Sequence, residues 1–263
     1  MRIALISFNP ECNNSVNNMQ ECKRLLDSIN EENVDICIFP ETTLTGFCFT
    51  SAHEIAEDLE KYRIIEFFSS LARNYATFII FGTFAYDRNR VNVKNSAFVL
   101  NRNGEIIGRY DKLHVFSPGG ESNYVTKGDS LCVFEVYGIY LGLVICYDLR
   151  FPELYHALSK NCSVIVNIAN WPSTRSDHWL SLLKARAIEQ QLFTVGVNRS
   201  GSDSDGVLFM GDSVVFDPYG KKSSPKVVKG GIQIFDLEID EVQNIQRRFD
   251  MKSDHRFKVI FQK

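Results

Sequence analysis

Apolar and polar positions follow two alternating rhythms in the first third of the chain. Compact apolar runs at residues 2–8, 35–39 and 77–84 are typical of buried strands. Between them, apolar residues recur at helical spacing in 16–29 and again in 64–75. This part of the chain is therefore predicted to alternate strands with amphipathic helices.

The rhythm changes in the middle of the chain, where apolar runs follow each other without a helix between them. The dipeptides Asn103-Gly104 and Tyr137-Gly138 each separate two such runs, the last of which ends at Cys146. Both dipeptides suit a tight turn, because glycine accepts a positive φ. Two antiparallel hairpins are predicted here.

The second half returns to alternation. Its pattern predicts helices near 153–160 and 175–191 and strands at 163–168, 192–198, 212–216 and 231–237. Because no linker, repeat or low-complexity stretch interrupts the pattern, one domain is expected over residues 1–263. The expected α/β fold has two stacked mixed sheets flanked by helices, with a doubly wound single sheet as the alternative.

Composition narrows the functional classes. The chain has 263 residues, 44% hydrophobic and 23% charged, with a formal net charge of -3. Such a chain can bury a sizeable core, and without a basic cluster it is not expected to bind nucleic acid. No segment reaches the length of a membrane span, and the first apolar run is too short for a signal peptide, so no membrane partner and a cytoplasmic location are expected.

Cysteine and histidine spacing argue against a metal site. Seven cysteines occur without a CxxC pair or zinc-type spacing, so most are expected to be reduced thiols. No HxxH or HxxxH pair exists. The stretch GSDSDG at 201–206 lacks the later glutamate of a calcium loop and is interpreted as a solvated turn.

Three residues with reactive or charged side chains stand at the ends of predicted strands. Glu41 follows Pro40, Lys112 follows the run EIIGRY, and Cys146 closes the run IYLGLVIC. Loops after strands are held by a rigid scaffold and carry chemistry more often than core positions. Each residue alone has an ordinary structural explanation, but together they form a catalytic combination.

The combination suits amide hydrolysis by a thiol. A free cysteine has a pKa of about 8.5 and is a weak nucleophile at neutral pH unless a neighbouring group activates it. Glu41 can take the thiol proton and return it to the leaving nitrogen. Lys112 and the N–H of Tyr147 can stabilise the oxyanion, each donor being worth roughly 3–4 kcal/mol.

Three motif blocks occur in the same order as in a known enzyme family. FPETTLTGF, YDKLH and CYDLRFPE resemble the blocks of the nitrilase superfamily of carbon-nitrogen hydrolases, whose catalytic set is Glu-Lys-Cys. The similarity runs from the first strand to about residue 250. Of the branches of this superfamily, the chain most resembles the ω-amidase-like amidases, through NIANWPSTRSDHW, KARAIEQQ and NRSG.

The resemblance carries several expectations. It implies a four-layer α-β-β-α sandwich, a homodimer, and catalysis without a cofactor. It also implies a fourth catalytic residue, a glutamate in the loop after the lysine, and Glu121 matches that position. Its implied role is to orient Lys112 and the substrate rather than to take the reacting proton.

The predicted function is hydrolysis of a small linear amide to a carboxylate and ammonia through a thioester on Cys146, with 2-oxoglutaramate as an example of the implied substrate. A nitrile hydrolase or an N-carbamoyl amidase uses the same residues and stays an alternative. A non-catalytic binding or regulatory protein, or a structural oligomer, is the alternative of another class.

Other charged residues near the motifs have local interpretations. Asp148 and Arg150 are interpreted as a structural pair that fixes the chain after Cys146, and Arg186 and Glu189 as an intrahelical pair. Arg175 follows Trp171-Pro172 and is a candidate for binding a substrate carboxylate, because a guanidinium binds a carboxylate with two hydrogen bonds.

Overall fold

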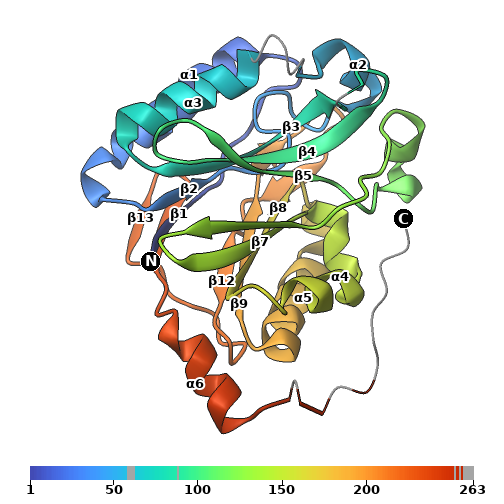
Figure 1. Cartoon of the computed structure of the whole chain (residues 1–263). Coiled ribbons are helices and arrows are strands. Elements are labelled where there is room, and N and C mark those ends of the chain that lie inside the picture. Colours follow the sequence, from blue (N-terminus) through green and yellow to red (C-terminus); the bar gives the residue numbers. More distant parts are fainter. Residues whose placement is uncertain (58–62, 88, 252, 255, 257–263) are drawn as a thin grey trace.

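Two β-sheets lie face to face, and helices cover the outer face of each (Figure 1). The computed structural model describes residues 1–57, 63–87, 89–251, 253, 254 and 256. The order of layers is helices, sheet, sheet, helices, so the expected four-layer α-β-β-α sandwich is confirmed. The alternative of a doubly wound single sheet is wrong.

The first sheet has the strand order β13-β14-β1-β2-β3-β4-β5. Its strands are β1 (Arg2–Ile6), β2 (Ile36–Ile38), β3 (Phe78–Tyr86), β4 (Val93–Leu100), β5 (Ile106–Asp111), β13 (Val227–Lys229) and β14 (Ile232–Asp236). The pairs β1–β2 and β2–β3 are parallel and the others antiparallel. Parallel neighbours need a crossover, which α1 (Ser15–Ser28) and α3 (Arg63–Tyr75) provide.

The second sheet has the order β12-β9-β8-β7-β6. Its strands are β6 (Cys132–Val136), β7 (Ile139–Ile145), β8 (Val164–Ala169), β9 (Phe193–Asn198) and β12 (Val214–Phe216). Strands β7, β8 and β9 are parallel, with α4 (Pro152–Leu158) and α5 (Ser176–Gln190) as crossovers. Both predicted hairpins, β4–β5 and β6–β7, are antiparallel as expected.

Several short elements lie outside the predicted ones. They are β10 (Ser200–Ser202), β11 (Leu208–Met210), β13, α2 (Ala52–Ile55), α6 (Asp240–Arg248) and 3-10 turns at Asn30–Glu32, Phe49–Ser51, Ser117–Gly119, Glu121–Asn123, Cys146–Arg150 and Ser173–Arg175. Most are three to five residues long, which is too short for a periodic pattern to form.

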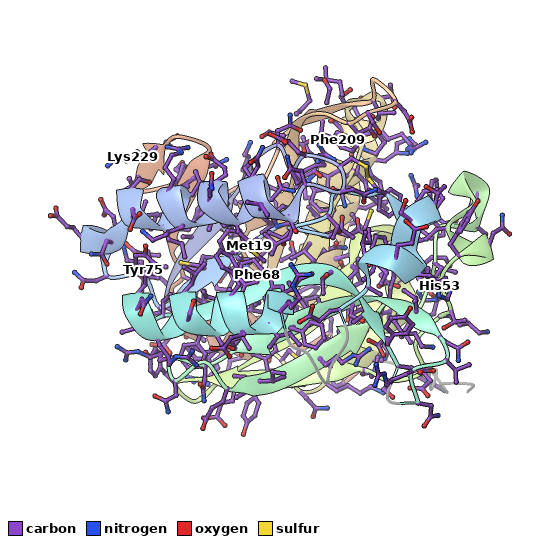
Figure 2. All side chains as sticks on the ribbon, turned by 90° about the horizontal axis from the view of Figure 1, so that it is seen from above. Met19, His53, Phe68, Tyr75, Phe209 and Lys229 are labelled. Carbon is purple, nitrogen blue, oxygen red and sulfur yellow. A yellow bond between two sulfur atoms is a disulfide. The ribbon has the colours of Figure 1, made fainter. Side chains whose placement is uncertain are left out.

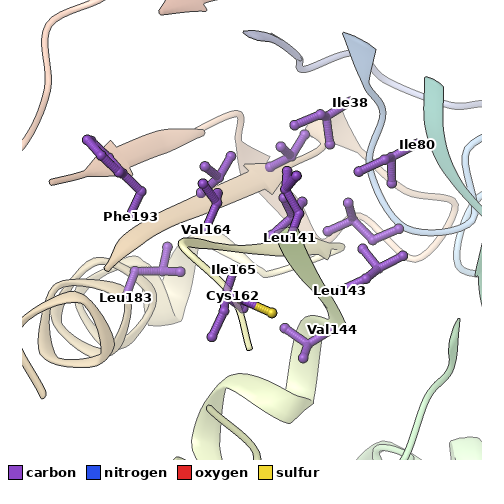
Figure 3. Packing of buried hydrophobic residues seen from close by; sticks show 14 of the residues in the cluster. Ile38, Ile80, Leu141, Leu143, Val144, Cys162, Val164, Ile165, Leu183 and Phe193 are labelled. Atoms are coloured by element: carbon purple, nitrogen blue, oxygen red, sulfur yellow. The ribbon is translucent and has the colours of Figure 1, made fainter. Parts of the chain in front are cut away.

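Alternating side chains build two apolar layers. Ile3 and Leu5 of β1 join the core between the sheets, whereas Ala4 and Ile6 join the core under α1 and α3. Figure 3 shows Ile38 and Ile80 of the first sheet opposite Leu141 of the second. Because both faces of the central strands are buried, these strands read as continuous apolar runs.

The two helices of the first outer layer run side by side (Figures 1 and 2). Met19 of α1 and Phe68 of α3 lie in this layer, and Phe68 stacks on Phe81 of β3 with ring centroids 4.0 Å apart. In the part of the chain that the structure describes, no helix is long and apolar enough to cross a membrane.

One pair of cysteines is bonded. Cys12, in the loop after β1, forms a disulfide with Cys48, in the loop after β2. The remaining five cysteines form no disulfide, which agrees with the expectation that most are reduced. The sequence pattern contained no signal for this pair, because 36 positions separate its members and only the fold brings the two loops together.

Candidate active site

Glu41, Lys112 and Glu121 meet in the interior, although they come from three separate loops. Glu41 follows β2, Lys112 follows β5, and Glu121 begins the turn Glu121–Asn123. The ammonium of Lys112 lies 3.0 Å from Glu41 Oε1 and 2.9 Å from Glu121 Oε2. All three side chains are fully buried. A buried charge needs partners, and here one cation is shared by two carboxylates.

Asn95 connects the two carboxylates from β4, the second strand beyond β2 in the sheet. Its Nδ2 donates to Glu41 Oε1 and to Glu121 Oε1, each at 2.7 Å. Glu121 also accepts the main-chain N–H of Phe116 at 2.6 Å. Both carboxylates therefore have several hydrogen-bond donors, as a buried polar group needs.

Cys146 stands where β7 turns sharply into the 3-10 turn Cys146–Arg150. Its φ is +47°, in the left-handed region that a residue with a β-carbon rarely adopts. The side chain of Asn167, on β8, holds the main chain of Cys146 by two hydrogen bonds. Its Oδ1 accepts from the Cys146 N–H at 2.7 Å, and its Nδ2 donates to the Cys146 carbonyl at 3.4 Å. The same Nδ2 also contacts the hydroxyl of Tyr155 at 3.0 Å.

Asp148 fixes the other side of this turn. It is fully buried and accepts hydrogen bonds from the N–H of Ile145 at 3.0 Å and the hydroxyl of Tyr110 at 2.8 Å. His114 also contacts it, through its N–H and its ring. Asp148 therefore supports the turn as expected, but the predicted pairing with Arg150 is wrong. Arg150 instead lies over the Trp171 ring, 4.8 Å from its centroid.

The thiol of Cys146 contacts Asn170, and Cys146 lines the same cavity as Lys112. Its Sγ donates to the main-chain oxygen of Asn170 at 3.8 Å. Asn170 follows β8, and its N–H donates to Glu41 Oε2 at 2.8 Å. The predicted Glu41, Lys112, Cys146 and Glu121 are thus brought together.

The pKa values of Cys146 and Lys112 are both raised by their surroundings. Burial raises the pKa of Cys146 well above its ordinary value, Glu41 raises it further, and Lys112 offsets only part of this. Burial by itself lowers the pKa of Lys112, but the carboxylates of Glu121 and Glu41 outweigh it, so this pKa lies above its ordinary value. The resting site therefore contains a lysine cation and a protonated thiol.

A cavity of about 260 Å³ opens onto Cys146. Its lining includes Lys112, Tyr147, Asn170 and Arg175, together with aromatic side chains such as Phe47 and Phe209. The guanidinium of Arg175 lies 5.7 Å from the Phe116 ring centroid. The cavity wall thus carries the thiol and charged groups of both signs, among them the Arg150 and Arg175 guanidinium groups, and its volume suits a small polar ligand.

Two further interpretations can be compared with the structure. Arg186 and Glu189 form the expected pair at 3.0 Å, and Arg186 also donates to the Leu149 carbonyl. The GSDSDG stretch covers the end of β10 and most of the turn that leads to β11, and its Asp203 and Asp205 also line the cavity. The solvated-turn interpretation therefore missed a contribution to the site.

Sequence reasoning also missed three asparagines, Asn95, Asn167 and Asn170. One signal was available, because Asn167 interrupts the otherwise apolar strand VIVNIA. A buried amide needs hydrogen-bond partners, so a polar residue within such a strand indicates a function in holding neighbouring groups. Among the described residues, no group of three or more His, Cys, Asp or Glu side chains could hold a metal ion.

Comparison with known proteins agrees with this geometry. The family model described as "Carbon-nitrogen hydrolase" matches residues 2–247. A "Hydrolase in agr operon" from Staphylococcus aureus is 33% identical over 213 residues, 80% of each chain. The 2-oxoglutaramate amidase of Bacillus subtilis (strain 168) is 30% identical over 226 residues, 86% of each chain.

The fold comparison extends over nearly the whole chain. The crystal structure of XC1258 from Xanthomonas campestris, described as a CN-hydrolase superfamily protein with an arsenic adduct in the active site, has a TM-score of 0.89 and 25% identity. The match covers 99% of this chain and 98% of that chain. Together with the family match, these similarities show that the chain belongs to the carbon-nitrogen hydrolase family, whose members act on non-peptide C–N bonds and include ω-amidases.

Proposed function

We propose that the protein is a cofactor-independent ω-amidase that hydrolyses a short linear amide through a thioester on Cys146. The observation that carries this proposal is the position of Cys146 in the cavity wall beside Lys112, which lies between the carboxylates of Glu41 and Glu121. This site contains a nucleophile, a base and a cation within one small volume, as amide hydrolysis requires.

In the first half-reaction, Glu41 takes the proton from Cys146 while the sulfur attacks the amide carbon. The electrons of the C=O bond move to oxygen, where Lys112 and the N–H of Tyr147 stabilise the negative charge. The intermediate then collapses. The C–N bond breaks, the nitrogen takes the proton from Glu41, and ammonia leaves behind a thioester.

In the second half-reaction, water replaces ammonia. Glu41 takes a proton from the water, whose oxygen attacks the thioester carbon. The C–S bond then breaks, and the sulfur regains a proton from Glu41. Glu121 takes no part in proton transfer in this scheme. It holds Lys112, whose raised pKa keeps the ammonium charged throughout.

The proposed substrate carries a carboxylate at the end remote from the amide. Arg175 lines the cavity, and a guanidinium recognises a carboxylate by two parallel hydrogen bonds. The similarity to a 2-oxoglutaramate amidase supports the same class, the terminal amides of short dicarboxylic or 2-oxo acids such as 2-oxoglutaramate.

The decisive experiment is mass spectrometry of protein quenched during turnover of a panel of amides, nitriles and N-carbamoyl compounds. We expect an acyl adduct on Cys146 with 2-oxoglutaramate, release of ammonia, and loss of both in Cys146→Ala. Cys162→Ala, at a buried cysteine outside the disulfide, is the matched control and should keep full activity. Ammonia release unaffected by Cys146→Ala would refute the proposal.

The proposal includes one domain, a homodimer and a cytoplasmic location. A single domain is supported by a continuous core that contains residues of both sheets, such as Leu5 and Leu143. Sedimentation should give about twice the mass of the 30.0 kDa chain. Fractionation of cells that produce the protein should place it in the cytoplasmic extract.

A further inference from the structure

The two oxygens of the Glu41 carboxylate have different surroundings. Oε1 accepts from Lys112 Nζ at 3.0 Å and from Asn95 Nδ2 at 2.7 Å. Because Oε1 accepts two hydrogen bonds, both of its lone pairs are used. Both bonds are strong, since Lys112 is charged and Asn95 is close. This oxygen has no room for the thiol proton unless it gives up a strong hydrogen bond.

Within the part of the chain that the structure describes, Oε2 has hydrogen-bond contacts with Asn170 alone. It accepts the Asn170 N–H at 2.8 Å and lies 3.2 Å from Asn170 Nδ2. That Nδ2 also reaches Thr42 Oγ1 at 3.0 Å and the Glu41 carbonyl at 3.1 Å. An amide nitrogen has two hydrogens for these three acceptors. The longest contact, to Oε2, is therefore dispensable, and Oε2 keeps a lone pair for a proton.

Asn170 also touches the group that gives the proton. In the resting site, Cys146 Sγ donates to the main-chain oxygen of Asn170, at 3.8 Å. Only the Cα and the carbonyl carbon separate the N–H of a residue from its carbonyl oxygen, so one backbone conformation of Asn170 places both groups. The main chain of Asn170 thereby contacts both the thiol and Glu41 Oε2.

We propose that Asn170 is a positioning residue that selects Oε2 of Glu41 as the atom accepting the Cys146 proton. This inference rests on the proposed function and adds a step to it. The S–H bond breaks, the proton moves to Oε2, and the sulfur electron pair forms the bond to the substrate carbon. The Asn170 amide keeps its contacts to Thr42 Oγ1 and the Glu41 carbonyl, so protonation of Oε2 leaves neither of its hydrogens without an acceptor.

The side chain anchors this arrangement. Asn170 is 6% exposed, and its Nδ2 contacts fasten the start of the loop after β8 to the loop after β2. Without them, the main chain of Asn170 is free to shift away from Oε2. Placing an acid at this position puts a second carboxyl beside Oε2, and two carboxyls in contact compete for one proton.

Two variants test the proposal, Asn170→Ala and Asn170→Asp. The primary measurement is the rate of Cys146 alkylation by iodoacetamide as a function of pH, followed by peptide mass spectrometry. This reaction needs the thiolate but no amide substrate. We expect Asn170→Ala to slow alkylation at neutral pH by about tenfold or more, and Asn170→Asp to shift its midpoint upward by about one pH unit or more.

Asn18 provides the matched control. It is also a buried amide, 2% exposed, and its Nδ2 donates to two main-chain carbonyls, those of Glu11 and Leu44, at 2.8 Å each. It touches neither Glu41 nor Cys146. Asn18→Ala and Asn18→Asp should therefore lower the melting temperature without moving the pH profile of alkylation.

The outcomes are separable. Folded Asn170 variants that alkylate with the wild-type rate and pH profile overturn the inference, whatever happens to turnover. If no amide is hydrolysed by the wild type but the Asn170 variants change alkylation as expected, the proposed function fails and the positioning role stands. If Asn170→Asp does not fold, Asn170→Ala decides.

Discussion

Glu121→Gln is the most informative perturbation of the charged cluster, because it keeps the shape of the side chain and removes one charge. Glu121 accepts from Lys112 Nζ on both oxygens, at 3.2 Å and 2.9 Å. Asn95 Nδ2 donates to one oxygen and the Phe116 N–H to the other. Glutamine has one acceptor oxygen, so its NH2 group must face Lys112 and one of the other two donors.

The expected loss of stability follows from these contacts. One buried N–H loses its acceptor, which destabilises the fold by about 1–3 kcal/mol. Lys112 loses one of two carboxylate partners, and removing one member of a buried ion pair costs about 3–5 kcal/mol. Because Glu41 still neutralises Lys112, the lower part of this range applies. We expect a total near 4 kcal/mol, or a melting temperature roughly 8–16 °C lower.

In this variant, kcat should fall while the reactivity of the Cys146 thiol does not. A less firmly held Lys112 stabilises the oxyanion poorly, so kcat should fall by about 100-fold or more. The charge of Glu121 is one of the causes that raise the pKa of Cys146, so its removal lowers that pKa. Alkylation of Cys146 by iodoacetamide should therefore be equal to or faster than in the wild type.

Urea unfolding, ammonia release and iodoacetamide alkylation check these three expectations on one preparation. Glu66→Gln is the control, because Glu66 pairs with Arg73 on the surface, where both side chains are largely exposed. Its effect on stability should be below about 1 kcal/mol. A Glu121→Gln variant whose free energy of unfolding lies within about 1 kcal/mol of the wild-type value would refute the expected loss of stability. A variant that keeps the wild-type kcat would show that Glu121 is not needed to hold Lys112 for catalysis.

Three further predictions concern other parts of the protein. The pKa of Lys112 is raised above 10.5, so the stability that its ion pairs contribute is fully present below pH 10.5 and is lost only as the pH rises through the raised value. The difference between the urea midpoints of wild type and Lys112→Met should thus not shrink between about pH 7 and 9, and a difference that shrinks over this range would contradict the assignment. Arg175→Met should raise KM for anionic amides by about tenfold or more and leave KM for neutral amides of equal length unchanged; equal effects on both would exclude a carboxylate contact. Cys12→Ser should lower the free energy of unfolding by about 4 kcal/mol, because it opens the loop that the disulfide closes. Thiol titration of the unfolded wild type should find five thiols, and a count of seven would show that the disulfide is absent in solution.

Much of the architecture could be predicted from local pattern. The strands at 2–8, 77–84 and 163–168 were recognisable because both of their faces are buried, and α3 because its apolar residues repeat at helical spacing. The short strands β10, β11 and β13 were missed, because three residues carry too little periodicity and pair only in the folded chain.

The candidate catalytic residues could also be predicted from the sequence. Glu41, Lys112, Glu121 and Cys146 could be selected from their places after predicted strands and from the resemblance to a known family. The environments of these side chains could not be predicted, because burial and hydrogen bonding in the folded chain determine them. Nothing in the pattern indicated that Asn95 donates to both carboxylates or that Asn170 contacts both Glu41 and Cys146.

The sequence by itself determined the kinds of element, their order and the identity of the reactive side chains, because periodicity and turn chemistry act over a few neighbouring residues. Only the tertiary structure decided which groups touch. Lys112 and Glu41 are 71 positions apart, and Asn170 and Glu41 are 129 apart. The first bond joins the ends of β5 and β2 within one sheet, and the second exists because the two sheets pack face to face and bring the ends of β8 and β2 together. Such long-range pairing leaves no periodic trace in the chain.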